Sequence, residues 1–319
     1  MEPIFLDPSC KDAIWGGTRL KDEFGKKGGE RVAESWELSC HPNGPSVIRG
    51  GEYAGKTLAE YLAENRAALG TACAKFEEFP ILIKLIDAKR DLSIQVHPDN
   101  DYALRHEGQY GKTEMWYVVD CEPGAKLLYG FSKELTPEEF SRQIRENTLL
   151  DSLNAVPVKK GDVFFIPART VHAIGAGILV AEIQQNSDVT YRIYDYGRLG
   201  TDGKPRQLHI EQASQAADLH PVVPDSRPKG EPHKDGGAVR TLLASCEYFT
   251  TEHIELNGEA SLNAGESSFH CLLCLDGEAG LNVGGKTYRI GKGETVFLPA
   301  GLGAYAISGQ ADLLLTYLE

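Results

Sequence analysis

Two polar side chains from one short segment are spaced to hold a metal ion or a polar ligand. Residues 92–98 read Leu-Ser-Ile-Gln-Val-His-Pro, so apolar and polar side chains alternate. This period of two predicts a strand with one buried face. Gln95 and His97 then project from the same face, and Pro98 ends the strand. An amide oxygen beside an imidazole can bind one metal ion, although the same pair can also simply satisfy one another as half-buried side chains.

A second segment adds a carboxylate and a cation. Residues 111–119 (GKTEMWYVV) alternate as a strand, with Glu114 on an otherwise apolar face and Lys112 on the same face. A carboxylate at such a position is a candidate third metal ligand. The lysine beside it can carry charge or move a proton.

The strongest spacing signal in the chain is a Gly-Pro-His pattern. Five residues separate Gly161 from Pro167, and four separate Pro167 from His172. This spacing predicts a turn, a strand over 163–166, a proline-directed corner and an inward-facing imidazole. It resembles the second conserved motif of the cupin superfamily, whose small jelly-roll barrels bind a metal inside. Arg169 stands where that motif usually has glycine, so we expect the corner to differ slightly.

The Gly-to-Pro spacing recurs near the C-terminus at Gly293–Pro299, which predicts a second barrel. Ala304 stands at the ligand position there, and a methyl group cannot bind a metal. The equivalent opening strand offers only His270, and one imidazole does not make a site. We therefore expect the second barrel to be without a metal, with His253 and Cys274 as the residues that would have to assist if one bound.

These patterns predict a mainly β fold with helical excursions, built from two cupin barrels of the double-stranded β-helix or jelly-roll type. We assign residues 1–220 to a catalytic, metal-binding cupin domain with helical insertions. Residues 221–236, rich in proline and charge, are expected to form a linker. Residues 237–319 are expected to form a second cupin-like domain that lacks metal ligands.

Helical spacing and end signals occur in three segments. Residues 56–69 place Leu58, Tyr61 and Leu62 on one face, and Thr57 is a candidate N-cap. The segment 136–147 has proline just inside its start and acidic residues in its first turn. A further helix is expected within 209–218.

Composition excludes several classes of protein. The 319 residues carry a net charge of −13, which disfavours nucleic-acid binding because phosphate contacts need clustered cations. No apolar run is long enough for a membrane span, and Met1 to Pro8 lacks the features of a secretion signal. Seven scattered cysteines suggest a reducing, cytoplasmic location. Cys271 and Cys274 have redox-motif spacing, but we interpret them as reduced core residues of a strand.

Two charged segments can be interpreted in two ways from local sequence. Lys84 interrupts the apolar run 79–86, so it either reaches out at the strand end or faces a polar pocket. Residues 182–198 place charged side chains among aromatic ones. Such a run is commonly a solvated edge, but its position directly after the His172 strand favours pocket lining.

Several motifs together resemble the type I mannose-6-phosphate isomerase family. The resemblance covers most of residues 1–220, and the chain length is similar to that of short bacterial members. The matching segments are 15–17 (WGG), 34–39 (ESWELS), 95–98 (QVHP), 111–116 (GKTEMW), Pro167 with His172, and 184–192 (QQNSDVTYR). One departure is Gly-Lys-Thr-Glu where longer members have His-Lys-Pro-Glu, so a role for that histidine does not transfer.

The resemblance implies a zinc enzyme that interconverts mannose 6-phosphate and fructose 6-phosphate through an enediol. Carried over by motif, the zinc ligands are Gln95, His97, Glu114 and His172, with one Zn²⁺ per chain. The implied partner is a small phosphosugar, with no nucleic acid and no membrane. We expect a monomer or a weak homodimer.

The resemblance also implies roles around the metal. Arg192 falls on the family's catalytic arginine and is expected to hold the phosphate or the developing oxyanion. Asp188 falls on the acid that accompanies it, and Lys112 on the lysine two residues before the ligand glutamate. Either of these two is a candidate for ring opening or proton transfer, and Lys112 would need a depressed pKa to act as a base. Lys84 matches a substrate-binding lysine, which favours the pocket interpretation.

Three alternatives stay open. An iron dioxygenase of the same superfamily would want a different ligand set. A sugar-binding cupin without activity would keep the barrel but lose the cationic pocket. An isomerase that has lost activity, or acts on another phosphosugar, has the same sequence features.

Overall fold

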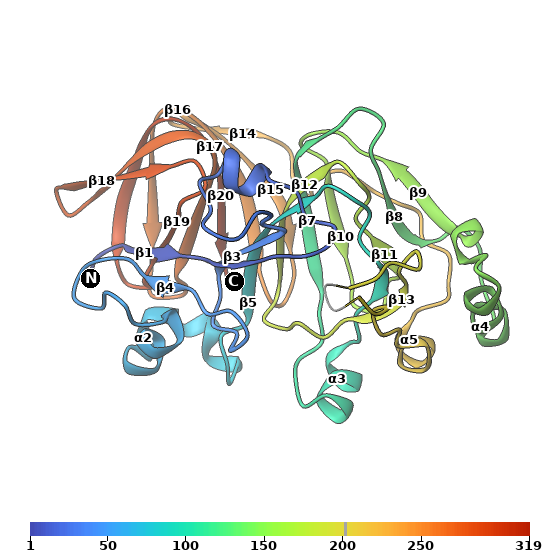
Figure 1. Cartoon of the computed structure of the whole chain (residues 1–319). Coiled ribbons are helices and arrows are strands. Elements are labelled where there is room, and N and C mark those ends of the chain that lie inside the picture. Colours follow the sequence, from blue (N-terminus) through green and yellow to red (C-terminus); the bar gives the residue numbers. More distant parts are fainter. Residues whose placement is uncertain (201–202) are drawn as a thin grey trace.

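The chain folds into two β-rich bodies that lie side by side (Figure 1). The structure, a computed structural model, describes residues 1–200 and 203–319. The first body holds two sheets, of six and five strands, and the second body is a nine-stranded sheet. The predicted mainly β fold class is confirmed, and the two bodies fit the predicted pair of barrels.

The two sheets of the first body are antiparallel throughout. The six-stranded sheet has the order β10 (Val163–Ile166), β7 (Glu114–Cys121), β12 (Ile178–Gln185), β5 (Ile81–Ala88), β3 (Glu34–Leu38) and β2 (Ser9–Lys11). The five-stranded sheet has the order β13 (Tyr191–Tyr194), β6 (Ile94–Val96), β11 (His172–Ala173), β8 (Lys126–Phe131) and β9 (Leu153–Pro157). The strand expected over residues 92–98 is therefore shorter than predicted, and His97 lies just beyond its end.

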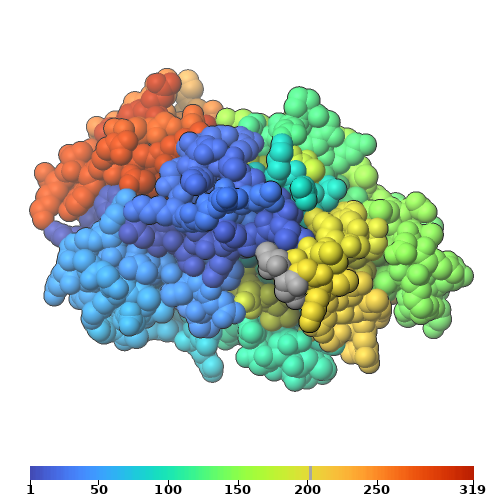
Figure 2. Space-filling view, viewed as in Figure 1, coloured from blue at the N-terminus to red at the C-terminus, as the bar shows by residue number. Residues whose placement is uncertain are grey.

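The second body combines strands from both ends of the chain. Its sheet order is β14 (His233–Asp235), β15 (Ala238–Ser245), β16 (Thr250–Ala264), β20 (Gly303–Tyr317), β17 (His270–Val283), β19 (Thr295–Leu298), β1 (Ile4–Asp7) and β4 (Val47–Ile48), with β18 (Lys286–Gly291) beside β17. In Figure 2 the N-terminal segment, in dark blue, covers the junction of the two bodies. The division at residues 220 and 237 stays a prediction, and β14 lies inside the segment expected to be a linker.

The helices of the chain are short. They are α1 (Arg19–Asp22), α2 (Leu58–Glu64), α3 (Asn100–His106), α4 (Pro137–Glu146), α5 (Ile210–Ala216) and the 3-10 turns Arg66–Leu69, Thr71–Lys75 and Leu149–Ser152. Thr57 caps α2 as predicted, and both Thr57 and Thr136 form a capping box with the glutamate three residues later. The helix expected over 56–69 ends at Glu64 and continues as a 3-10 turn. Within the described ranges no helix is long and apolar enough to cross a membrane.

The strand β7 separates two cores because alternate residues face opposite sides. Met115, Tyr117 and Val119 pack in the core shared with the second body. Trp116 and Val118 pack inside the first body with residues of β10 and β12. Glu114 lies on this second side, so the predicted face of Glu114, Trp116 and Val118 is confirmed.

The residue at the corner, Arg169, has nearly the same positive φ as the glycine of the second corner, although the corner was expected to differ slightly. Arg169 has φ +77°, and Gly301, two residues after Pro299, has φ +78°. An L-residue is strained in this left-handed region. Surrounding contacts hold Arg169 there, since its backbone N–H donates to the His97 carbonyl at 2.6 Å and its Nε donates to the Ala216 carbonyl at 3.0 Å. The corner thus ties the two ligand segments together.

This strain predicts an order of stabilities. Arg169→Gly and Arg169→Ala both lose the side-chain contacts, but only the alanine keeps the unfavourable φ. Arg169→Gly should therefore unfold with a free energy about 1 kcal/mol higher than Arg169→Ala. Gly301→Ala, whose added Cβ meets only Met1 at 3.7 Å, should lose a similar amount relative to wild type. Denaturant unfolding measures all three, and equal stability of the two Arg169 variants would show that the corner carries no strain.

Candidate metal centre

Pairing between strands brings three of the predicted site residues into one row. Arg192 of β13 lies opposite Gln95 of β6, and Gln95 lies opposite His172 of β11. Directly opposed residues of antiparallel strands project from the same face. Gln95, His172 and Arg192 therefore point the same way from the five-stranded sheet, towards the six-stranded sheet that carries Glu114.

Three donor groups converge between these sheets. Ligand atoms of His97, Glu114 and His172 all lie within 4.8 Å of one another, and all three residues are buried. His172 Nε2 is 3.3 Å from Glu114 Oε1, and His97 Nε2 is 3.6 Å from Glu114 Oε2. Such a group of two imidazoles and a carboxylate is a typical protein ligand set for a divalent metal.

Backbone carbonyls orient both imidazoles. Nδ1 of His97 is 2.8 Å from the Val189 carbonyl, and Nδ1 of His172 is 2.8 Å from the Thr170 carbonyl. A carbonyl only accepts, so each Nδ1 carries the proton and each Nε2 presents its lone pair, which now faces Lys112 Nζ at 3.3 Å in His97 and Gln95 Nε2 at 3.4 Å in His172. Both lone pairs lie beside Glu114, which is the arrangement that neighbouring groups impose on metal-binding histidines.

The charge states at the cluster fit a metal cation. Burial and nearby Lys112 hold the pKa of His97 well below its usual value, and burial lowers the pKa of His172 to about 4. Burial also raises the pKa of Glu114 to about 7. Neither Glu114 oxygen has a well-aligned hydrogen bond among the described residues, although the Lys112 ammonium lies 2.6 Å from Oε2. Burial thus disfavours the charged form of Glu114 in the metal-free site, and a divalent ion beside two neutral imidazoles would supply the missing positive charge.

Gln95 lies close enough to join this cluster. Its amide Nε2 is 3.4 Å from His172 Nε2. To bind a metal through oxygen, the amide must turn by half a rotation, which exchanges two ends of nearly equal shape. That turn would give up the 3.5 Å hydrogen bond that Gln95 Oε1 accepts from Ser93 Oγ.

Two lysines share one buried carboxylate beside the cluster. Glu182 Oε1 is 3.3 Å from the ammonium of Lys84 and 3.3 Å from that of Lys112, and its Oε2 accepts from Trp116 Nε1 at 3.1 Å. Burial would raise the pKa of Glu182, but the two ammonium groups outweigh it and lower the pKa to about 2. Lys84 is thus buried, with its ammonium near the carboxylates of Glu182 and, at 3.7 Å, Glu34, and it does not reach out to solvent.

Lys112 is held as a cation. Burial alone would lower its pKa, but Glu114 and Glu182 outweigh burial and raise the pKa of Lys112. This direction is opposite to the depressed pKa that a lysine base requires. In this arrangement Lys112 supplies positive charge.

Sequence reasoning placed Glu182 in a pocket-lining run but did not assign it to the site. Its partnership with Lys84 follows from the register of β12 and β5, in which the two residues are directly opposed. Trp36 of β3 is opposed to Lys84 in turn, and the lysine ammonium lies 4.9 Å from its ring centre. These contacts join strands that are far apart in sequence. The only local sign of them was a charged residue within an otherwise apolar run.

Arg192 is half-buried on the shared face, and burial lowers its pKa. Its Nη1 donates to the Gln207 carbonyl at 2.9 Å. Its Nε is buried without a hydrogen-bond partner in residues 1–200 and 203–319. A guanidinium with unused donors next to a metal cluster can hold an anionic ligand.

Asp188 lies at the edge of the site and contacts the N-terminal segment. It accepts a hydrogen bond from Asn43 Nδ2 at 2.7 Å, and its Oδ1 is 3.5 Å from Nε2 of buried His41. The adjacent Val189 carbonyl orients His97. His41 and Asn43 were not anticipated from the sequence, because nothing local pairs them with a residue 145 positions away.

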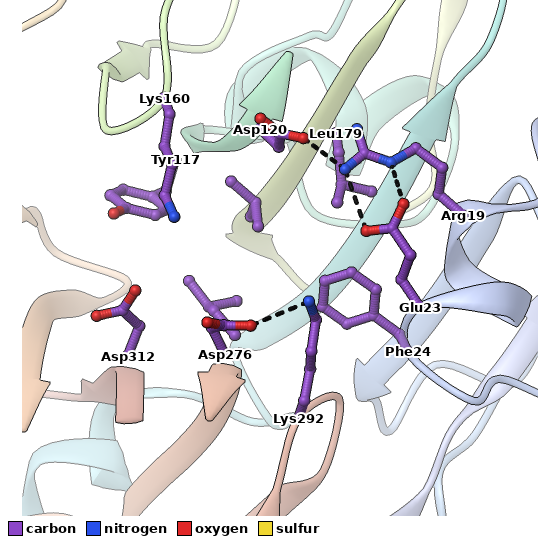
Figure 3. Close-up of a pocket in the computed structure, with 12 residues that line it drawn as sticks. Arg19, Glu23, Phe24, Tyr117, Asp120, Lys160, Leu179, Asp276, Lys292 and Asp312 are labelled. Atoms are coloured by element: carbon purple, nitrogen blue, oxygen red, sulfur yellow. Dashed lines mark hydrogen bonds and ion pairs between the residues drawn. The ribbon is translucent and has the colours of Figure 1, made fainter. Parts of the chain in front are cut away.

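A separate charged cavity lies on the other side of β7. Its volume is about 220 Å³, and residues of both bodies line it, including Tyr117, Lys160 and Asp312 (Figure 3). Arg19 is paired there with Glu23 and Asp120, and Lys292 with Asp276. Tyr117 and Glu114 face opposite sides of the strand, so this cavity is distinct from the metal cluster.

In the second body, the residues expected at the position of the metal cluster contact one another or neighbouring side chains. His270 Nδ1 is 2.8 Å from the Tyr305 hydroxyl, and Arg240 makes a two-pronged ion pair with Glu252 at 2.8 and 3.0 Å. His253 lies against Tyr117 of the first body, on the opposite face from neighbouring Glu252. Cys274 is buried in the apolar core. These residues do not converge, and both Cys271 and Cys274 are buried free thiols.

We therefore expect His270→Ala to leave the metal content of the full chain unchanged. Its imidazole contacts tyrosine rings and no carboxylate within ion-pair distance among the described residues. Elemental analysis of dialysed protein should give one metal per chain before and after the substitution. Two metals in wild type and one in the variant would reveal a second site.

Comparison with known proteins adds an independent line of observation. A family model described as "Phosphomannose isomerase type I, catalytic domain" matches residues 4–118, and one described as "Mannose-6-phosphate isomerase, cupin domain" matches residues 238–318. The chain is 39% identical to mannose-6-phosphate isomerase ManA of Bacillus subtilis over 99% of both chains. It is 37% identical to the mannose-6-phosphate isomerase of Streptococcus mutans over 99% of this chain and 98% of that protein.

Solved structures agree with these sequence matches. The crystal structure of mannose 6-phosphate isomerase from Bacillus subtilis superposes with a TM-score of 0.93 at 38% identity, covering 99% of both chains. Phosphomannose isomerase from Salmonella typhimurium, represented by its E264A mutant, has a TM-score of 0.78 at 20% identity and shares the fold.

Proposed function

This chain belongs to the type I mannose-6-phosphate isomerase family, and on that premise we propose that it interconverts mannose 6-phosphate and fructose 6-phosphate. The reaction moves a proton between C1 and C2 of the open-chain sugar through an enediol, with negative charge developing on oxygen. The single observation that carries the proposal is the buried cluster of His97, Glu114 and His172, flanked by two lysines that share Glu182.

The proposed cofactor is one Zn²⁺ ion per chain, held by Gln95, His97, Glu114 and His172. Two nitrogen donors, one carboxylate and one amide oxygen make four ligands from the protein. Bound there, the ion supplies positive charge that polarises a sugar carbonyl and stabilises the enediolate oxygens. The carboxylate is the only anion of the set, so it contributes most to holding a dication.

The lysines and Arg192 set the charge of the pocket. Lys84 and Lys112 place two ammonium groups beside Glu182, and each also contacts a further carboxylate, Glu34 at 3.7 Å and Glu114 at 2.6 Å. We assign Lys84 to substrate binding. Arg192, with unused donors on the same face as Gln95 and His172, is assigned to the phosphate or the developing oxyanion.

Proton transfer is assigned to Asp188, at the edge of the site, and to buried Lys112. Asp188 is partly exposed, with 30% of its side chain accessible, and Asn43 and His41 orient it. A carboxylate in this position can take and return a proton during ring opening. Lys112, held as an ammonium, can donate a hydrogen bond to a sugar oxygen.

A coupled assay tests the function. Protein is given mannose 6-phosphate, and fructose 6-phosphate is detected with and without a chelator. We expect turnover that the chelator removes and added Zn²⁺ restores. Absence of fructose 6-phosphate, with another phosphosugar converted in its place, would reassign the substrate; binding without any conversion would leave a sugar-binding protein.

We further propose a cytoplasmic protein that acts as a monomer or weak homodimer. All seven cysteines are free, and they do not pair with one another. This supports a reducing compartment. Size-exclusion chromatography with light scattering measures the oligomeric state.

A further inference from the structure

One buried amide on the inner face of the first body has an acceptor without a partner. Gln184 of β12 has 0% of its surface exposed, and the strand register places it directly opposite Glu114. Opposed residues of antiparallel strands share a face. Gln184 therefore lies on the same side of the sheet as Glu114 and Glu182, beside the metal cluster.

The orientation of this amide is determined by its neighbours. Nε2 donates to the Gln185 carbonyl at 2.6 Å and to the Ser187 carbonyl at 2.7 Å. Both partners are carbonyls and can only accept, so the NH₂ end must face them. Oε1 is left as the free end, with no hydrogen-bond partner in residues 1–200 and 203–319.

A buried, unpaired amide oxygen is unfavourable, and native proteins leave few of them. The adjacent glutamine shows that this region can satisfy such a group. Oε1 of Gln185 accepts from the Thr113 backbone N–H at 2.8 Å, and its Nε2 donates to Asn100 Oδ1 at 3.0 Å. Oδ1 of Asn186, just beyond the strand, also has no hydrogen-bond partner among the described residues, but only Gln184 lies within β12 opposite Glu114.

We propose that Gln184 Oε1 accepts a hydrogen bond from a hydroxyl group of the bound sugar phosphate. This inference rests on the proposed isomerase function and assigns a further substrate-binding residue to it. A sugar hydroxyl is a neutral donor that suits a neutral acceptor with a locked orientation. The metal already has four protein donors in Gln95, His97, Glu114 and His172. Gln184 discriminates between sugars, because a site built around a hydroxyl rejects a ligand that lacks it.

Gln184→Met tests the assignment, since methionine keeps the length of the side chain and removes the acceptor. The zinc-loaded variant should bind mannose 6-phosphate about tenfold more weakly, the usual effect of one lost hydrogen bond. Zinc content and affinity in a chelator competition should match wild type. Gln143→Met is the control: that amide is also buried, but its oxygen already accepts from Ser152 Oγ. It should leave substrate affinity unchanged.

A panel of monodeoxy analogues of mannose 6-phosphate identifies the hydroxyl. Calorimetric binding constants are measured for wild type and Gln184→Met. For one analogue the losses from the missing hydroxyl and the missing amide should not add, because both remove the same hydrogen bond. Should the methionine variant fail to fold, Gln184→Asn, which keeps the amide but shortens its reach, takes its place.

Two results would overturn the proposal. Unchanged substrate affinity and additive losses for every analogue would assign the free acceptor to a buried water. Loss of zinc from Gln184→Met would make the residue a metal ligand. These outcomes do not depend on the isomerase assignment. That assignment fails only if wild-type protein does not convert mannose 6-phosphate. Even then, the binding constants of the analogues still test the role of Gln184.

Discussion

Replacing Glu114 with glutamine should remove the bound metal and abolish turnover while the fold stays intact. Glu114 is the only anion among the four proposed ligands, and both imidazoles contact it within 3.6 Å. An amide in its place keeps the shape but loses the charge that balances a dication. The loss of metal affinity should exceed the 10- to 100-fold effect typical of residues that only support a ligand.

Zinc analysis after dialysis, activity and circular dichroism together check this prediction. His172→Ala should behave in the same way, since it removes a second ligand. Glu139→Gln is a matched control, because that glutamate caps α4 on the surface and should keep full metal content. Full occupancy in both ligand variants would show that the ligands are misassigned.

Arg192→Ala should destroy turnover while zinc stays bound. The guanidinium lies on the shared face with Gln95 and His172 but contacts neither Glu114 nor His97 within ion-pair or hydrogen-bond distance among the described residues. If Arg192 stabilises charge that appears only in the transition state, kcat should fall on the order of a hundredfold or more.

Steady-state kinetics on metal-replete protein separate the possible roles of this arginine. Arg192→Lys keeps the positive charge but loses the planar guanidinium with its several N–H donors. Its kcat should therefore lie between those of Arg192→Ala and wild type. A rise in KM with unchanged kcat would recast Arg192 as a substrate-binding residue. Wild-type kinetics would remove it from the site.

Local sequence was sufficient for the residues whose chemistry depends on short spacing. The alternation around Gln95 and His97, the strand that presents Glu114, and the Gly-Pro-His spacing before His172 all place donors on inner faces, as the structure has them. Periodicity is a local property, so it can be recognised in the sequence without knowledge of the fold. Recognition of the family then supplied the roles that periodicity alone left open.

Strand register was not accessible in this way. Glu182 lies opposite Lys84, and Gln184 lies opposite Glu114, because β12 runs antiparallel between β5 and β7 in one alignment. A shift by one residue would turn both side chains to the opposite face. The entry of β1 and β4 into the sheet of the second body has the same origin, since it joins residues almost 300 positions apart.

Arg169 illustrates a different failure of sequence reasoning. Its residue type argued against a left-handed corner, but the surrounding hydrogen bonds impose that conformation. Tertiary contacts override a local preference of about 1 kcal/mol when several of them act on one residue.

A titration of activity with zinc tests the central claim most directly. Metal-free protein is given increasing Zn²⁺, and conversion of mannose 6-phosphate to fructose 6-phosphate is measured at each step. Activity should start near zero, rise linearly and stop rising at one equivalent per chain, because among the described residues the donors come together only in the first body. Full turnover by the metal-free protein, or a plateau reached only at two equivalents, would contradict a single catalytic metal at His97, Glu114 and His172.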